Sequence, residues 1–437
     1  MFPMFVSRTT VWSVTRALQS VVVAIALTTT GAQALTLDEA LTLDEALRLA
    51  QQRSRQLVAQ DASAAAAREM ARAAAQLPDP TLKAGISNIP IDGPDQFSLG
   101  TDFMTQRSIG VAQEFTRADK RRARAARFER EAETVDAVRS LALSNLRRDT
   151  ALAWLDRYYQ ERVREVLLSQ RDEARLQIDA ADGAYRGGRG AQADVFSARS
   201  AVALIEDRIA QSERQIAAAT TQLARWIGAA AKQPLSELPA LDKVALNTRD
   251  IETDLAHHPQ IAIMTRQEEM AQADAQIARA NKRADWSFEV MFSQRGPAYS
   301  NMVSLNVSIP LQWDQKNRQE RELAAKLAGV EEMRAQREEA TRAHVAEVQL
   351  MLQEWQSDRE RLGRYDQSII PLAGERTKAA LAAYRGGSLA LGAVLDARRN
   401  EIDLRLERLR LEMDSARLWA QLNFLFPGEH DAAAPRH

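Results

Sequence analysis

The stretch Ala-Tyr-Arg-Gly-Gly occurs twice, at residues 184–188 and again 199 residues later at 383–387. The similarity continues after each copy at the same offset. Val195, Ala198 and Arg199 follow the first, and Val394, Ala397 and Arg398 follow the second. A second pair of matching stretches, 111–115 and 307–311, supports a duplication. The chain is therefore interpreted as one structural unit written twice.

Long helices are predicted on both sides of each Gly-Gly pair. From residue 117 to 184 apolar residues recur every three or four positions, as in Val135, Val138, Ala142 and Leu146. A second long helix is expected at 316–383, with an interruption at Pro371, which cannot donate the helical hydrogen bond. The glycines suit a chain reversal. The helices are then expected to return to Trp226 and Phe424.

Each half also carries a segment with a period of two. Val303, Leu305, Val307 and Ile309 alternate with polar residues, which indicates a strand with one apolar face. We expect β-hairpins at about 81–116 and 285–312. Nearby methionines (Met104, Met291, Met302) are interpreted as lipid-facing or core residues rather than metal ligands.

The predicted domain organisation follows from these segments. Residues 35–228 form the first repeat, with a tip turn at 185–190, and 259–426 form the second, with a tip turn at 384–390. Residues 229–258 link them. Residues 1–34 are predicted to be a signal peptide, because an apolar run at 21–27 follows Arg16 and precedes Ala32-Gln33-Ala34. A disordered tail is expected at 427–437.

Composition excludes several classes of site. The 437 residues include no cysteine, so disulfides, thiolate metal sites and a lipid anchor on an N-terminal cysteine are excluded. The net charge of −1 gives no general attraction to nucleic acid. No nucleophile constellation, phosphate loop or metal-ligand spacing is found. His257-His258 is interpreted as a solvated helix entry. We therefore expect neither an enzyme nor a bound cofactor or metal.

Two hairpins give four strands, too few to close a barrel. Strands that face lipid must close, because unpaired edges are not tolerated in hydrocarbon. A trimer would pool twelve strands, which an outer-membrane barrel allows. The aromatic residues of the second hairpin would then form an interfacial belt: Trp286, Phe288, Phe292, Tyr299 and Trp313. The alternative is a soluble hairpin on a coiled-coil protein.

The repeat, the hairpins and the export signal together resemble the TolC family of outer-membrane efflux channels. The resemblance spans about residues 43–426 and rests on the two Tyr-x-x-Gly turns, the strand ending Val307–Leu311 and the duplication. It implies a mainly α protein with a small β part. The implied assembly is a trimer, with a 12-stranded outer-membrane barrel continued by a 12-helix periplasmic α-barrel and an equatorial segment at 229–258.

The same resemblance implies roles for residues at the periplasmic tips. The turns would contact an adaptor protein through Tyr185, Arg186, Gly187, Gly188, Tyr384, Arg385, Gly386 and Gly387. Asp194 and Tyr384 match residues that help close the tip, but Leu389 stands where an arginine is expected. Asp396 matches an aspartate that rings the entrance, whereas Ala393 replaces another. The latch would then be looser, or be held by Arg385, Arg186 or Arg189 instead. Asp194 could instead be a helix cap, and Asp396 a surface carboxylate paired with Arg398 or Arg399.

The implied function is a passive, gated exit duct in the outer membrane of a Gram-negative bacterium. It would work with a periplasmic adaptor and an inner-membrane transporter of the RND type. Residues 308–318 resemble the heavy-metal efflux branch, so metal cations are the first expected cargo. Drugs or type I secreted proteins are alternatives, and a soluble periplasmic coiled-coil adaptor is a different class. The basic run at 120–127 is expected to meet lipid headgroups, with nucleic acid or heparin as the alternative.

Overall fold

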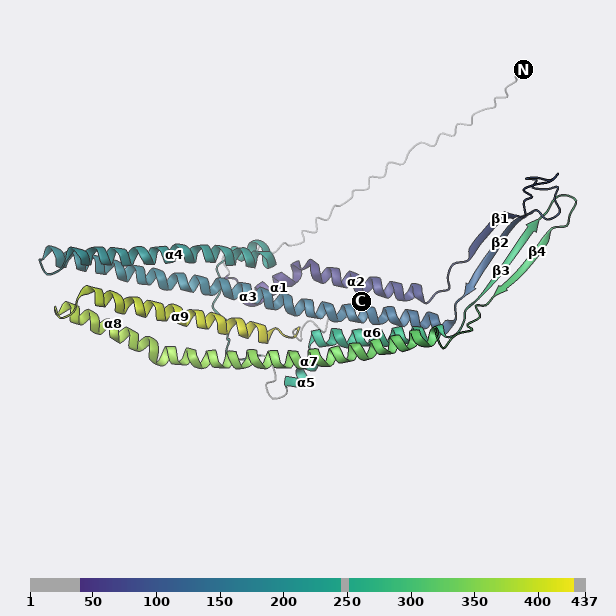
Figure 1. Cartoon of the computed structure of the whole chain (residues 1–437). Coiled ribbons are helices and arrows are strands. Elements are labelled where there is room, and N and C mark those ends of the chain that lie inside the picture. Colours follow the sequence, from purple (N-terminus) through teal and green to yellow (C-terminus); the bar gives the residue numbers. More distant parts are fainter. Residues whose placement is uncertain (1–39, 245–250, 428–437) are drawn as a thin grey trace, which may run out of the picture. The chain divides into compact units, whose positions relative to one another are not determined.

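Long helices make up most of the protein in the computed structural model, which describes residues 40–244 and 251–427. The expected signal peptide and residues 428–437 of the expected tail lie outside the described residues. The first helical hairpin consists of α3 (Ala118–Arg186) and α4 (Gln192–Ile227). At 1.5 Å per residue, the 69 residues of α3 span about 100 Å. The helix therefore separates its hairpin turn widely from the strand that precedes it (Figure 1).

The second hairpin is built from α7 (Gln319–Arg364), α8 (Ile370–Arg385) and α9 (Leu391–Asn423). Between α7 and α8 lies one π-helical turn, Tyr365–Ile369, which ends two residues before Pro371. This turn accommodates the hydrogen bond that proline cannot donate. Arg408 of α9 holds it in place, with Nε 2.6 Å from Oδ1 of Asp366 and Nη2 3.1 Å from Oδ2.

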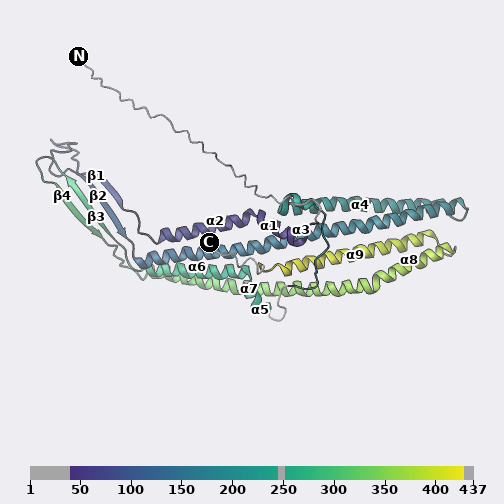
Figure 2. The same cartoon turned by 180° about the vertical axis from the view of Figure 1, so that it is seen from behind.

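Shorter helices cover the part of α3 nearest the strands. They are α1 (Leu43–Arg53), α2 (Arg55–Ala74) and α6 (Pro259–Asn281). Ser54 separates α1 from α2, because its Oγ accepts the Leu57 N–H at 3.3 Å and caps α2. α2 and α6 pack on α3, and α6 packs on α7. The row α2, α3, α6, α7 thus leaves α2 and α7 at its two edges (Figure 2).

The strands form one antiparallel sheet in the order β1 (Thr81–Ser87), β2 (Gln106–Phe115), β3 (Trp286–Gln294) and β4 (Met302–Ser308). Pairing of β2 with β3 joins the two halves of the chain, with Val111 opposite Val290. The sheet is open among the described residues, because neither β1 nor β4 has a partner on its outer edge.

The two faces of the sheet differ in polarity. Side chains of directly paired residues lie on the same face. The register therefore gathers exposed apolar residues on one face: Leu82, Val111, Val290 and Leu305 in one row, and Ala84, Ile109, Phe292 and Val303 in the next. The other face is mostly polar, and Lys83 pairs with Glu289 across it. Met291 and Met302 lie on this polar face, opposite Ser304 and Ser293, rather than on the apolar face.

The main core lies where α3, α4, α7 and α9 meet the segment between the repeats. That segment contains a 3₁₀ turn, Gly228–Lys232, and α5 (Ile251–Ala256). Trp154 is fully buried there, and its indole Nε1–H donates to the Leu41 carbonyl at 3.2 Å. Leu41 in turn bridges to Leu235. In the described parts of the chain, no helix is both long and apolar enough to cross a membrane.

Candidate functional site at the helix turns

The two Ala-Tyr-Arg-Gly-Gly turns have the same backbone. The Arg189 N–H donates to the Ala184 carbonyl at 2.9 Å, and the Ser388 N–H donates to the Ala383 carbonyl at 3.0 Å. Gly188 has φ +69° and Gly387 has φ +75°, a region that glycine enters without strain. The repeated sequence is therefore explained by the reversal that each pair of helices requires.

The side chains of the two turns are not equivalent. Tyr185 is exposed, whereas Tyr384 packs against an apolar cluster that joins both hairpins (Ala181, Val195, Ala198, Leu391 and Val394). Arg186 pairs with Asp182 at 2.6 Å, whereas Arg385 has no ion pair with any described residue. Leu389, where the resemblance expects arginine, is partly exposed. The turns thus present Tyr185, Arg186 and Arg189 of the first hairpin and Arg385 and Leu389 of the second outward.

The two expected gate aspartates have different surroundings. Oδ2 of Asp194 accepts the Ala191 N–H at 3.1 Å, so this carboxylate caps the start of α4. Asp396 is exposed, and no described residue forms an ion pair with it. Arg398, proposed above as an alternative partner, pairs instead with Glu173 and Glu401. Asp396 borders a groove of about 360 Å³ between α4 and α9, beside Ser197 and Ser200.

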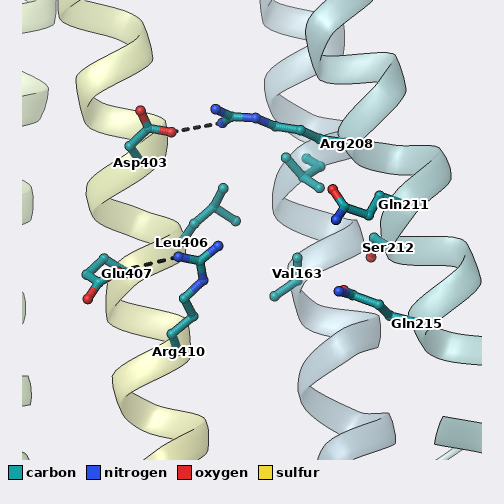
Figure 3. Close-up of a pocket in the computed structure, with 10 residues that line it drawn as sticks. Val163, Arg208, Gln211, Ser212, Gln215, Asp403, Leu406, Glu407 and Arg410 are labelled. Carbon is teal, nitrogen blue, oxygen red and sulfur yellow. Dashed lines mark hydrogen bonds and ion pairs between the residues drawn. The ribbon is translucent and has the colours of Figure 1, made fainter. Parts of the chain in front are cut away.

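A second hollow, of about 350 Å³, lies further along the seam between α4 and α9 (Figure 3). Val163 and Leu406 contribute its apolar lining. Arg208 borders both hollows, and its Nη1 lies 2.8 Å from Oδ1 of Asp403. This ion pair crosses the seam between α4 and α9, and the pair of Arg398 with Glu173 likewise joins the two hairpins. This contact was not anticipated, because no sequence motif joins residues 208 and 403.

Four of the five aromatic residues expected in a belt lie along β3 or beyond its ends. Trp286, Phe288 and Phe292 share the apolar face, and Trp286 stacks on Phe115 with ring centroids 4.3 Å apart. Tyr299 lies between β3 and β4, beneath Arg295. Trp313 follows β4 and is 88% exposed. The aromatic side chains Phe97 and Phe103 of the β1–β2 loop are also exposed and were missed.

Comparison with solved structures identifies related folds. The outer-membrane channel OprN is 18% identical, with a TM-score of 0.74 over 88% of this chain and 90% of OprN. CusC, which forms a transmembrane channel, is 17% identical, with a TM-score of 0.70 over 88% of this chain and 92% of its own. The open MtrE outer-membrane channel of Neisseria gonorrhoeae is 16% identical, with a TM-score of 0.67 over 88% and 89%. This chain has the fold of an outer-membrane channel.

The resemblance to the TolC family is thereby confirmed at the level of the fold. A scan against protein-family models finds no match, and a search of curated proteins finds none either. The match covers the helical hairpins and the sheet alike, since it extends over 88% of the chain. In this channel fold, the turns and the sheet lie at opposite ends of α3 (Figure 1).

One histidine in the channel fold contradicts the sequence interpretation. His257 is exposed, but His258 is buried, with 4% of its surface accessible. Its ring lies 4.2 Å from that of His344 and contacts Phe426 edge-on. Nδ1 of His258 accepts the Gln260 N–H at 3.3 Å, which caps α6. Among the described residues, no group of three or more histidine or acidic side chains could hold a metal ion.

Proposed function

We propose that the chain is the outer-membrane exit duct of a tripartite efflux system. In this proposal three copies close a 12-stranded barrel and a 12-helix α-barrel. The duct is passive and receives its cargo from an inner-membrane RND-type transporter through a periplasmic adaptor. The observation that carries the proposal is the open four-stranded sheet, whose one exposed face is apolar along its central rows.

The sheet is evidence both for insertion into a membrane and for assembly as a trimer. An apolar face this large is stable in lipid but unfavourable in water. Lipid in turn tolerates no unpaired strand edge. The free edges of β1 and β4 are opposite in the sheet order, so β4 of one copy can pair with β1 of the next in a head-to-tail ring. Twelve strands then close the ring.

The helices support the same ring. α2 and α7 are the edges of their row, just as β1 and β4 are the edges of the sheet. α2 precedes β1 in the chain and α7 follows β4. The edge helix and the edge strand on each side of the protomer therefore come from the same repeat. Copies joined through their sheets would therefore also meet through α2 and α7.

The turns supply the proposed adaptor contact and gate. Adaptor contact is assigned to Tyr185–Gly188 and Tyr384–Gly387, which lie at the end of the helical hairpins and are exposed apart from the partly buried Tyr384. Asp396, Asp194, Tyr384 and Arg385 are the proposed gate residues. The free carboxylate of Asp396, repeated three times, would form a ring that favours cations. Heavy-metal cations are the proposed cargo, and loss of the gene should then lower metal tolerance rather than drug tolerance.

The proposal is tested by fractionation and native mass. Outer membranes are separated, the chain is extracted in detergent, and its mass and conductance in a planar bilayer are measured. A conducting trimer from the outer membrane supports the duct. A monomer extracted without detergent, with no conductance, would contradict it and favour a periplasmic coiled-coil adaptor.

Asp396→Ala is expected to weaken blockade of the pore by multivalent cations. Three carboxylates around one constriction attract a divalent ion by 1 kcal/mol or more, so the half-blocking concentration should rise on the order of tenfold. Single-channel recording measures it. Asp207→Ala, which removes an exposed carboxylate of α4, is the matched control. Equal blockade of both variants and the unaltered channel would exclude the ring.

Reversing one charge of the Arg208–Asp403 pair is expected to open the seam. An exposed ion pair stabilises the closed channel by at most about 1 kcal/mol. Asp403→Arg should therefore raise the ratio of open to closed channels about fivefold. The double variant Arg208→Asp/Asp403→Arg should restore the original ratio. Glu213→Arg is the control, because Glu213 pairs with Arg164 within one hairpin. If it opens the channel equally, the seam has no special role.

A further inference from the structure

The sheet meets the helices at a tightly connected junction. The Arg117 N–H donates to Oδ1 of Asp285 at 2.9 Å, which joins the start of α3 to the start of β3. Nζ of Lys282 lies 3.1 Å from Oε1 of Glu320, which joins the end of α6 to the start of α7. Side chains at this level are therefore held at a fixed height relative to the apolar face.

The apolar face extends into the junction. Ile309 and Leu311, which follow β4, continue the alternation of the strand and remain exposed. Trp313 is next in the series and is the most exposed large apolar side chain in the described residues, at 88%. Indole rings favour the boundary between hydrocarbon and headgroups. Trp313 thus marks the height at which a bilayer would end.

A tight turn follows Trp313 immediately. Oδ1 of Asp314 accepts from Nδ2 of Asn317 at 2.9 Å, and the Arg318 N–H donates to the Asp314 carbonyl at 3.2 Å. The Asp314 carboxylate is thus bound to the turn, and no described cation pairs with it. Lys316 and Arg318 remain exposed within five residues of the indole.

The cations at this level divide into two groups. Lys120 is buried and pairs with Asp285 at 2.7 Å, and Arg127 pairs with Glu131 and Asp274. These two members of the basic run, which were expected to meet headgroups, form ion pairs within the fold. Other cations are exposed and have no described carboxylate within ion-pair distance, among them Arg122, Lys316, Arg318 and Arg321. With Trp313, these four form what we call the junction collar.

We propose that the junction collar binds the anionic headgroups of phospholipids in the leaflet adjoining the helices. The inference rests on the proposed function, which places the apolar face in the outer membrane. The four cations have no acidic partner, so a headgroup with net negative charge complements them and a zwitterionic one does not. A polybasic surface beside a bilayer gains about 1 kcal/mol for each lysine or arginine, a factor of about five in affinity.

The test uses the full-length protein in detergent with mixed lipids. Purified protein is mixed with equal amounts of phosphatidylglycerol and phosphatidylcholine, and native mass spectrometry records the lipids retained. The unaltered protein should retain phosphatidylglycerol preferentially. Lys316→Gln/Arg318→Gln should lower that preference about 25-fold, since two cations are lost. Arg364→Gln/Arg376→Gln, which removes two exposed cations far from the sheet, should leave it unchanged.

The oligomer mass and the conductance are recorded from the same samples, which separates the two proposals. A conducting trimer with equal retention of both lipids would overturn the collar and leave the duct intact. A preference that both double variants lower equally would also overturn it, because charge alone would then explain binding. Excess glycerol phosphate distinguishes headgroup chemistry from lipid: if it removes the preference completely, the site binds free phosphate and the lipid proposal fails.

Discussion

Leu305→Arg should block stable insertion of the protein into a bilayer. Leu305 lies in the middle of β4, on the apolar face opposite Val290, and is 65% exposed. An arginine facing lipid near the bilayer centre destabilises an inserted barrel by about 2–4 kcal/mol. All three copies of the proposed trimer would carry the substitution, so the destabilisation recurs in each copy. The measurement is the denaturant midpoint of the protein folded into phosphatidylcholine vesicles.

The neighbouring residue provides a matched control. Ser304 lies opposite Met291 on the polar face, one residue away along the same strand. Because successive residues of a strand point to opposite faces, Ser304→Arg places the same charge in the lumen of the proposed barrel. It should leave the midpoint nearly unchanged and alter only ion selectivity. Equal destabilisation by both substitutions would mean that neither face contacts lipid.

The two faces of the sheet could be predicted from the sequence because the alternation of apolar and polar residues is a local pattern. Val303, Leu305 and Val307 alternate with polar residues, and strand geometry alone converts that period into two faces. The duplicated turns were equally accessible, since the Gly-Gly pairs at 187–188 and 386–387 fix the reversal by backbone conformation. The pairing of β2 with β3 depends on residues almost 180 positions apart. Such contacts follow from tertiary packing, and no local pattern encodes them.

In the candidate site, too, some roles follow from the local sequence and others depend on tertiary contacts. Asp194 and Asp396 both lie a few residues after a turn motif, yet one caps a helix and the other remains free. Sequence spacing left both alternatives open, because the choice depends on backbone geometry within one turn. The Arg208–Asp403 pair and the internal pairing of Lys120 required three-dimensional neighbours from other helices. Charged residues on long helices are thus the hardest to assign, since every face of the helix offers partners.

His258 leads to the second large expected effect, a loss of stability in acid. Burial and the neighbouring His344 lower the pKa of His258 from 6.5 to about 4. The unfolded chain therefore binds a proton on this residue below pH 6.5, whereas the folded chain resists it until about pH 4. Stability is complete above pH 6.5 and falls as the pH drops through this window. The loss reaches about 3 kcal/mol at pH 4.

The contribution of His258 is isolated by comparing pH slopes rather than absolute stabilities. His258→Asn retains a side-chain oxygen that can cap α6, but it does not titrate. The variant loses ring contacts with His344 and Phe426, so it should be less stable at pH 7 and yet lose less stability between pH 6.5 and pH 4. His257→Asn, at the exposed neighbour, should keep the original slope. Chemical denaturation at each pH measures both. A difference between the pH slopes of stability can arise only if the folded state excludes a proton that the unfolded chain binds. Equal pH slopes for His258→Asn and the unaltered protein would therefore show that the buried ring does not resist protonation.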